Sequence, residues 1–291
     1  MPPEAGAVRV ASLVPAATDL LLAMGCADVL AAVSNYDHDR PEIRHLPRVG
    51  DYQNLDWEQM RAVRPTLIIM QMAPERMPAG LRQRAEALGA RLVNIQIEQL
   101  QDVYSAIRSL GDAIGRPDRA AVLIARLSGR LDGIRASVAG LRSVPVLLVI
   151  SDDGLSVAGP RTFLDELLGI AGGNNVASRF AMRYPTIDRE MLLSLQPEVV
   201  IQLLPAASPV VVEQARRNWR AMSGLPAVSS GRVHILTDWY LLLPASHVAD
   251  VAEKFAQILH GGTAADSMPA DAGAAPATTR SATRPSGTEQ P

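Results

Sequence analysis

The chain has few of the residues that build disulfides, thiolate metal sites or large aromatic sites. Of its 291 residues one is a cysteine, and aromatic side chains make up 4%. The single Cys26 excludes an intrachain disulfide and any metal site built from several thiolates. Lys and Arg number 28 against 30 Asp and Glu, so the chain lacks the basic excess that binds a phosphate backbone. We therefore expect no nucleic-acid partner.

Long apolar runs are also missing. No segment reaches the roughly 18–20 consecutive apolar residues of a membrane-spanning helix, so we expect no transmembrane segment. The first residues, MPPEAGAVRVASLVP, show no basic stretch followed by an apolar one, and no signal peptide is visible in the chain as given. Taken alone, this start predicts a cytoplasmic chain. It fits equally a start that lies further upstream, or a chain numbered after processing.

Familiar catalytic motifs are absent. The sequence contains no G-x-G-x-x-G after a strand, no Walker A loop, no H-E-x-x-H and no G-x-S-x-G. His38 and His45 share a loop with three carboxylates, which makes a metal site one alternative, but loop carboxylates and histidines are more often solvated. We expect no enzymatic activity, no cofactor and no resident metal.

The most informative feature present is an internal repeat. Residues 56–69 read DWEQMRAVRPTLII and residues 188–201 read DREMLLSLQPEVVI, with a proline at the same offset in each. The pattern predicts a short helix, a turn at the proline, and a buried strand of the parallel type. Two copies predict two similar α/β lobes, and a two-lobed protein commonly holds its ligand in a cleft between the lobes.

The segments around the repeat complete this division. Residues 117–141 predict one long amphipathic helix with a proline in its first turn, long enough to join two lobes. Its predicted apolar stripe consists of Val122, Leu123, Leu127, Leu131, Ile134 and Val138. We expect an N-terminal α/β lobe over 8–115, an interlobe helix over 116–142 and a C-terminal α/β lobe over 143–260. Residues 261–291 are rich in Ala, Pro and Thr with little apolar mass, which predicts a disordered tail. Both lobes are expected to be Rossmann-like parallel sheets covered by helices.

Aromatic and amide side chains follow the predicted strands, at the edge of a parallel sheet where ligands bind. In a chain with 4% aromatic residues this placement is informative, because rings supply large and rigid contact area. Some of these side chains could instead cap the core. The candidate ligand-binding residues are Tyr36, Asp51, Tyr52, Gln53, Gln71, Met72, Trp239 and Tyr240.

Four segments, taken in order, resemble the iron-complex/cobalamin class of ABC-importer substrate-binding proteins. They begin RVASLVPAATDLLLAMG, LPRVGDYQN, GPRTFLDELLGIAGG and GRVHILTDWYLLLP, and the resemblance covers about residues 8–260. It implies two Rossmann-like lobes joined by one long helix, with a metal-chelate ligand in the cleft. Within the class the vitamin B12-binding proteins are most similar, and their cleft aromatics would correspond to Tyr36, Tyr52 and Trp239. Tyr52 and Gln71 depart from the pattern, because each stands where that group has a tryptophan.

The resemblance also implies a partner. Proteins of this class place one glutamate on each lobe against arginines of a membrane permease, and by motif position these would be Glu75 and Glu213. The expected function is non-covalent capture of cobalamin or a related corrinoid by an extracytoplasmic, monomeric binding protein that delivers it to the permease. The alternatives are a ferric siderophore or haem binder, for which Arg161 and Tyr184 are available, and a cytosolic enzyme or cofactor-handling protein on the same scaffold.

Overall fold

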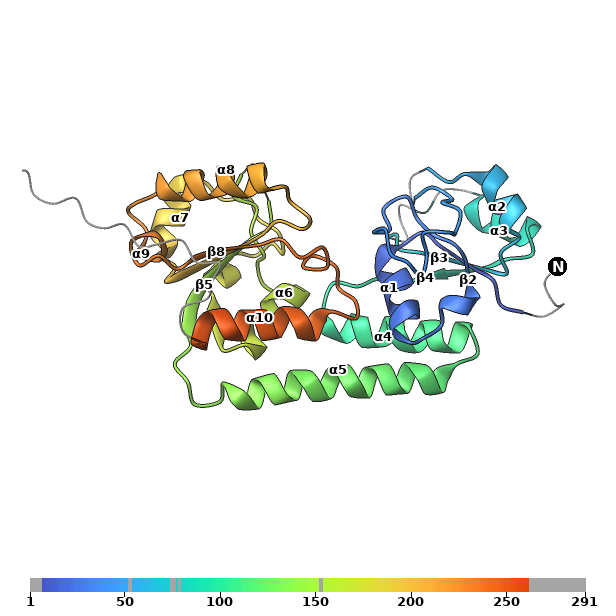
Figure 1. Cartoon of the computed structure of the whole chain (residues 1–291), viewed down its shortest axis with the longest axis horizontal. Helices are drawn as coiled ribbons and strands as arrows, with labels where there is room; N and C mark the ends of the chain where they lie inside the picture. Colours follow the sequence, from blue (N-terminus) through green and yellow to red (C-terminus); the bar gives the residue numbers. More distant parts are fainter. Residues whose placement is uncertain (1–6, 52–53, 74–76, 78–79, 152–153, 262–291) are drawn as a thin grey trace, which may run out of the picture.

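The computed structural model describes residues 7–51, 54–73, 77, 80–151 and 154–261, and shows two α/β lobes side by side above one long helix (Figure 1). Tyr52, Gln53, Glu75 and the predicted tail over 262–291 lie outside the described residues.

The first lobe is a four-stranded parallel sheet of order β2-β1-β3-β4. Its elements follow one another as strand and helix. They are β1 (Val10–Ser12), α1 (Pro15–Ala23), the 3-10 helix η1 (Ala27–Val29), β2 (Leu30–Ala32), α2 (Trp57–Val63), β3 (Leu67–Met70), α3 (Leu81–Ala87), β4 (Arg91–Asn94) and α4 (Leu100–Ala113).

The second lobe repeats this arrangement with a parallel sheet of order β6-β5-β7-β8. Its elements are β5 (Val144–Val149), α6 (Phe163–Ile170), β6 (Gly173–Asn175), the 3-10 helix η3 (Val176–Arg179), α7 (Arg189–Leu195), β7 (Val199–Leu203), α8 (Pro209–Arg220), α9 (Pro226–Ser229), β8 (Val233–Leu236) and α10 (Val248–His260). Two lobes of parallel strands confirm the predicted fold class.

The sequence repeat forms α2 and β3 in one lobe and α7 and β7 in the other. Asp56 caps α2 by accepting the N–H groups of Glu58 and Gln59, and Asp188 caps α7 by accepting that of Met191. Arg64 and Gln196 end the two helices at φ 50° and 48°, in the left-handed region. Each copy is therefore a helix capped by aspartate, a left-handed stop and a buried central strand, as predicted.

Helix α5 (Pro117–Ser137) connects the lobes and runs beneath both of them (Figure 1). It ends before the predicted residue 141. Leu123, Leu127 and Leu131 are buried along one face. The predicted stripe is wrong at Val122, which is 70% exposed because one residue from Leu123 is about 100° around the helix.

The apolar interior on the α5 side is shared by the two lobes. One continuous core cluster takes Leu20 from α1, Leu110 from α4, Leu127 from α5, Leu167 from α6 and Phe255 from α10. The opposite face of each sheet has a separate core cluster, one for each lobe. The connection between the lobes is thus a packed hydrophobic layer as well as a covalent helix.

Candidate functional site

The loops that follow β2 and β8 meet where the two lobes adjoin. His38 comes after β2 in the first lobe, and Trp239 comes after β8 in the second. Their rings are stacked, with centroids 5.2 Å apart and planes at 5°. Because both strands lie in parallel sheets, this contact brings carboxyl-end loops of the two sheets together, which is the edge where α/β proteins bind ligands.

Trp239 is the centre of an aromatic and cationic cluster. The Arg40 guanidinium carbon lies 5.2 Å from the Trp239 ring centroid, a distance at which a cation is attracted to an aromatic face. Tyr240 and His247 meet the ring edge to face, at centroid distances of 5.7 and 5.2 Å. The side chain of Trp239 is half-buried, so these neighbours hold the indole in one orientation while leaving part of its surface open.

Tyr240 extends the same cluster. Its ring stacks on His247 with centroids 4.4 Å apart and planes at 17°. Its hydroxyl donates a long hydrogen bond of 3.4 Å to Oδ1 of Asp238, whose other oxygen pairs with Lys254 at 3.2 Å. Burial and the Asp238 and Asp250 carboxylates raise the pKa of Tyr240 to about 12. Tyr240 therefore offers a neutral phenol at physiological pH.

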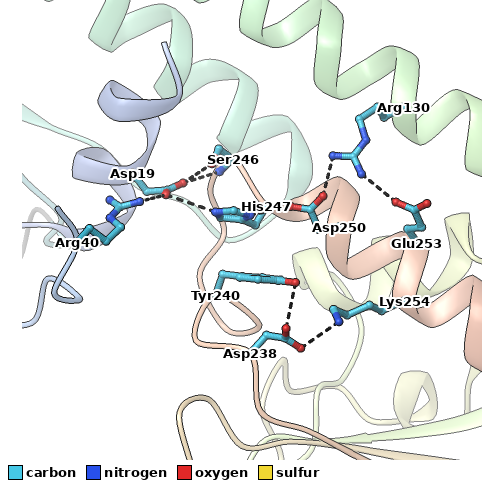
Figure 2. A network of polar contacts seen from close by, with 10 residues as sticks. All are labelled: Asp19, Arg40, Arg130, Asp238, Tyr240, Ser246, His247, Asp250, Glu253 and Lys254. Carbon is cyan, nitrogen blue, oxygen red and sulfur yellow. Dashed lines mark hydrogen bonds and ion pairs between the residues drawn. The ribbon is translucent and has the colours of Figure 1, made fainter. Parts of the chain in front are cut away.

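A polar network lies beside the rings and joins the lobes (Figure 2). Asp19, on α1, is 1% exposed and accepts a hydrogen bond of 2.7 Å from Arg40. It also accepts the N–H of Ser246 at 2.9 Å and the hydroxyl of Ser246 at 2.5 Å. His247 Nδ1 lies 2.6 Å from Asp250, and Asp250 in turn accepts from Arg130 of α5. The network thus connects both lobes to the long helix.

The loop that carries Tyr36 and His38 is held by a buried carboxylate. Asp37 accepts the Ser34 N–H at 2.8 Å and the Thr18 hydroxyl at 3.2 Å, while Arg48 donates to the carbonyls of Ser34 and Asp37. Burial raises the pKa of Asp37 to about 6, against the opposing effect of the Ser34 and Thr18 hydrogen bonds. This anchoring leaves Tyr36 64% exposed at the tip, available for contact with a ligand.

The other candidate residues of the first lobe have more internal roles. Asp51 is buried, and its Oδ1 accepts the Asn54 N–H at 2.8 Å, so its carboxylate holds a turn. The backbone of Met72 is clamped by the Asn94 amide, which accepts its N–H and donates to its carbonyl, and the Met72 side chain packs on the outer core of the lobe. Gln71 is half-buried between β3 and this clamp.

The docking candidate in the second lobe lies on the surface of α8. Glu213 is paired with two arginines of its own helix, Arg220 at 3.3 Å and Arg216 at 4.0 Å. Its counterpart Glu75 lies outside the described residues. The docking role of both stays a prediction.

Tyr184 and Arg161, the residues set aside for an iron chelate, belong to the second lobe. Tyr184 is 44% exposed, and burial together with the Glu98 carboxylate raises its pKa. Glu98 precedes α4 of the first lobe, so Tyr184 lies near the lobe junction. The Arg161 guanidinium donates to the carbonyl of Ala181 at 2.9 Å, and its φ of 61° is unusual for a residue with a side chain.

The ring cluster and its polar network include residues that are not sequence candidates, among them Asp19, His38, Arg40 and His247. His38 was considered with His45 as a metal ligand, but it stacks on Trp239 instead. Within the described residues no group of three or more His, Cys, Asp and Glu is placed to hold a metal ion. The one signal in the sequence was the length of the polar loop after β2, because long ordered loops are often functional. Pairing with Trp239 depends on a contact between residues 201 positions apart, which spacing alone does not predict.

Comparison with known proteins agrees with this arrangement. Residues 10–240 match the model of a family described as periplasmic binding protein. The chain belongs to this family. A vitamin B12-binding protein of Vibrio cholerae is 28% identical over 254 residues, which cover 85% of this chain and 87% of the relative. One from Pectobacterium carotovorum is 26% identical, over 82% of this chain and 86% of the relative.

Solved structures of two binding proteins have the same fold. The periplasmic vitamin B12-binding protein of Vibrio cholerae superposes with a TM-score of 0.70 at 25% identity, over 87% of this chain and 96% of that one. A periplasmic haem-binding protein from Pseudomonas aeruginosa gives a TM-score of 0.72 at 25% identity, over 90% and 95%. The relatives are substrate-binding proteins, so the expectation of a binding protein is confirmed and the enzyme alternative loses its support. In the described part of the chain, none of the helices has the length and hydropathy to cross a bilayer.

Proposed function

We propose that this periplasmic binding protein captures cobalamin or a related corrinoid between its lobes and delivers it to the permease of an ABC importer. The observation that carries the proposal is the ring cluster at the lobe junction, in which Trp239 of one lobe stacks on His38 of the other. A flat macrocycle is recognised mainly by flat aromatic walls, which give contact area at a small cost in conformational entropy.

Exposed rings on both lobes support the same ligand class. Tyr36 is 64% exposed after β2, and Tyr184 is 44% exposed on the second lobe. Together with the half-buried Trp239 they supply aromatic surface from both sides of the junction. The similarity to vitamin B12-binding proteins, which covers 85% of this chain, favours a corrinoid among the flat metal chelates.

Haem is the second candidate, because one feature of the cluster suits it. Haem carries carboxylate side chains, and Arg40 and His38 place cationic or proton-donating groups beside the Trp239 face. The haem-binding protein from Pseudomonas aeruginosa superposes as well as the vitamin B12-binding one. A ferric siderophore, for which Arg161 and Tyr184 are available, is the third.

A titration of the purified protein with cyanocobalamin, haemin and a ferric hydroxamate, followed by isothermal calorimetry, separates these candidates. We expect saturable one-to-one binding of cyanocobalamin and weaker or no binding of the other two. Tight binding of haemin alone would replace the corrinoid by haem. No binding of any of the three would remove the metal-chelate proposal.

Delivery of the ligand requires a permease partner and a location outside the cytoplasm. We infer that a monomer acts outside the cytoplasm, as the periplasmic relatives do, and docks on a permease through Glu75 and Glu213. Charge pairs across such an interface mainly set register and association rate. Glu213 would have to exchange its pairs with Arg216 and Arg220 for the permease arginines. Glu213→Gln is expected to slow association with the cognate permease in vesicles without changing ligand affinity, and a loss of ligand affinity instead would argue against docking.

A further inference from the structure

Two carboxylates, one from each lobe, accept hydrogen bonds from the opposite lobe across the junction. Asp19, on α1 of the first lobe, accepts the N–H of Ser246, which lies just before α10 of the second lobe. Glu166, on α6 of the second lobe, accepts the N–H of Leu100, the first residue of α4 in the first lobe, at 2.6 Å. The first N–H groups of a helix have no partner within the helix, and a carboxylate is their strongest acceptor. Glu166 thus satisfies the start of a helix of the other lobe, and Asp19 holds the residue that precedes the N-cap of α10.

The two carboxylates occupy equivalent places in the two lobes. Helices α1 and α6 each connect the first strand of a lobe to its edge strand, β1 to β2 and β5 to β6. Both helices are followed by a glycine in the left-handed region, Gly25 at φ 69° and Gly172 at φ 80°. Asp19 and Glu166 stand the same number of residues before these glycines. Either one can therefore serve as a matched control for the other.

The two contacts differ in what surrounds them. Asp19 also pairs with Arg40 at 2.7 Å and lies 3.8 Å from Nε2 of His247. Arg40 covers the face of Trp239, and His247 meets its edge. The hydrogen bond of Glu166 goes to Leu100, and in the part of the chain that the structure describes it joins no member of the Trp239 cluster.

The hydrogen bond to Asp19 fixes the position of the Arg40 side chain. The two side chains are 17% and 2% exposed, so the pair lies where solvent screens it little. Among the described residues Nε of Arg40 has no hydrogen-bond partner, and its Nη1 bonds to Asp19. Removing the Asp19 charge would leave a mostly buried guanidinium without its hydrogen-bonded carboxylate, and with only the electrostatic effect of Asp37 to hold it, such a group moves toward water. Arg40 would then leave the face of the indole.

We propose that Asp19 is a positioning residue for Trp239, acting through Arg40, Ser246 and His247 (Figure 2). The proposal deepens the proposed function, since it rests on Trp239 forming part of the ligand wall. Asp19 itself is 1% exposed, which leaves it almost no surface for contact with a ligand. Its effect on binding would come from the fixed orientation of the indole, which spares the ligand the entropic cost of ordering it.

Fluorine NMR of protein labelled with 5-fluorotryptophan tests the positioning without any ligand. The chain has three tryptophans, Trp57, Trp219 and Trp239, and Trp239→Phe identifies the resonance of interest. Asp19→Asn preserves the shape of the side chain and removes its charge. We expect it to shift or broaden the Trp239 resonance and leave the other two in place. The matched variant Glu166→Gln is expected to leave the Trp239 resonance unmoved.

Titration with cyanocobalamin tests whether the positioning of Trp239 affects ligand affinity. We expect Asp19→Asn to raise the dissociation constant about tenfold and Glu166→Gln to change it less than about twofold, since the loss of a charge-assisted contact is of that order. If the resonance moves but the wild type binds no cyanocobalamin, the corrinoid proposal fails and the positioning role stands. An unmoved Trp239 resonance in Asp19→Asn would overturn the positioning role, whatever the affinity.

A milder variant, Ser246→Ala, keeps the proposal testable if Asp19→Asn does not fold. Ser246→Ala removes the 2.5 Å hydroxyl contact with Asp19 and keeps the carboxylate and its pair with Arg40. We expect a smaller displacement of the same Trp239 resonance. If Asp19→Asn and Ser246→Ala both leave that resonance in place, or Glu166→Gln moves it equally, the two contacts only join the lobes and Asp19 has no special role.

Discussion

The two lobes share a strand order and differ in the loops that they bring to the junction. In both, an edge strand, a first strand and two further strands lie in the same parallel order, and an aspartate-capped helix precedes the third strand. After β2 the first lobe has a long polar loop anchored by Asp37, whereas after β8 the second has the aromatic segment of Trp239 and Tyr240. The common elements carry the fold, and the loops that differ form the candidate site.

The lobes also differ from independent domains in having a common core. The cluster on the α5 side draws on helices of both lobes, while the outer clusters belong to one lobe each. A shared apolar layer opposes large hinge motion, because opening it would expose buried surface. We therefore expect two nearly rigid lobes with a preformed site.

The largest expected effect tests this shared core. Leu127 is 1% exposed in the middle of α5, and Leu127→Ala is expected to lower the free energy of unfolding by about 2–5 kcal/mol. Val122 on the same helix is 70% exposed, and Val122→Ala should change it by less than about 0.5 kcal/mol. Urea unfolding should show one transition for both lobes. Two separate transitions, with only one displaced by Leu127→Ala, would show that the lobes unfold independently.

The second prediction concerns the anchor of the first lobe's loop. Burial raises the pKa of Asp37 from 3.8 to about 6, so between these values the folded chain binds a proton that the unfolded chain has lost. The contribution of protonated Asp37 to the free energy of unfolding is complete below pH 3.8. It is lost as the pH rises through 6, by up to about 3 kcal/mol. The stability of the wild type relative to Asp37→Asn should thus fall from pH 4 to pH 7. If the difference in stability between the wild type and Asp37→Asn stays constant from pH 4 to pH 7, the pKa of Asp37 in the folded chain is not raised to about 6.

The third prediction compares tryptophans inside and outside the junction. Trp239→Ala is expected to weaken binding of cyanocobalamin by about 1–3 kcal/mol, the scale of a lost aromatic contact. Trp57 is on α2, where Arg84 covers its ring at 5.5 Å, and Trp57→Ala should leave the affinity unchanged. Calorimetry measures both without relying on tryptophan emission. Equal losses for the two variants would remove Trp239 from the site.

The smallest expected effects compare the repeat copies. Asp56→Ala and Asp188→Ala each remove a helix cap and should each lower the free energy of unfolding by about 0.5–2 kcal/mol. Similar losses, measured by urea unfolding, would show that the repeat has the same structural role in both lobes. A loss in one lobe only would mean that the copies are alike in sequence and geometry but unequal in energy.

Most of the fold followed from local patterns, and the failures are instructive. The helix predicted over 117–141 ends at Ser137, ahead of Gly140, which adopts φ 82°. The edge strand β6 was not predicted, because Gly173–Asn175 has no apolar alternation and is held by pairing with β5. The prediction of an apolar stripe on α5 is confirmed at Leu123, Leu127 and Leu131, which are buried, and is wrong at the exposed Val122. Local propensity thus located the elements, and pairing or packing set their limits.

The candidate site divides in the same way. Trp239, Tyr240 and Tyr36 could be selected because aromatic residues are scarce here and these follow strands. Asp19 could not, since an aspartate within an apolar helix shows no sign in sequence of a partner in the other lobe. Asp51 was selected for its place in the chain, yet its carboxylate is used to hold a turn.

The sequence by itself determined the two-lobed α/β architecture, because the repeat, the strand patterns and the α5 stripe are local signals that act over a few residues. Only the tertiary structure decided how the lobes meet. The stacking of His38 on Trp239 and the reciprocal contacts of Asp19 and Glu166 join residues far apart in the chain. Such contacts arise from the packing of whole lobes on a shared core, and no local pattern encodes them.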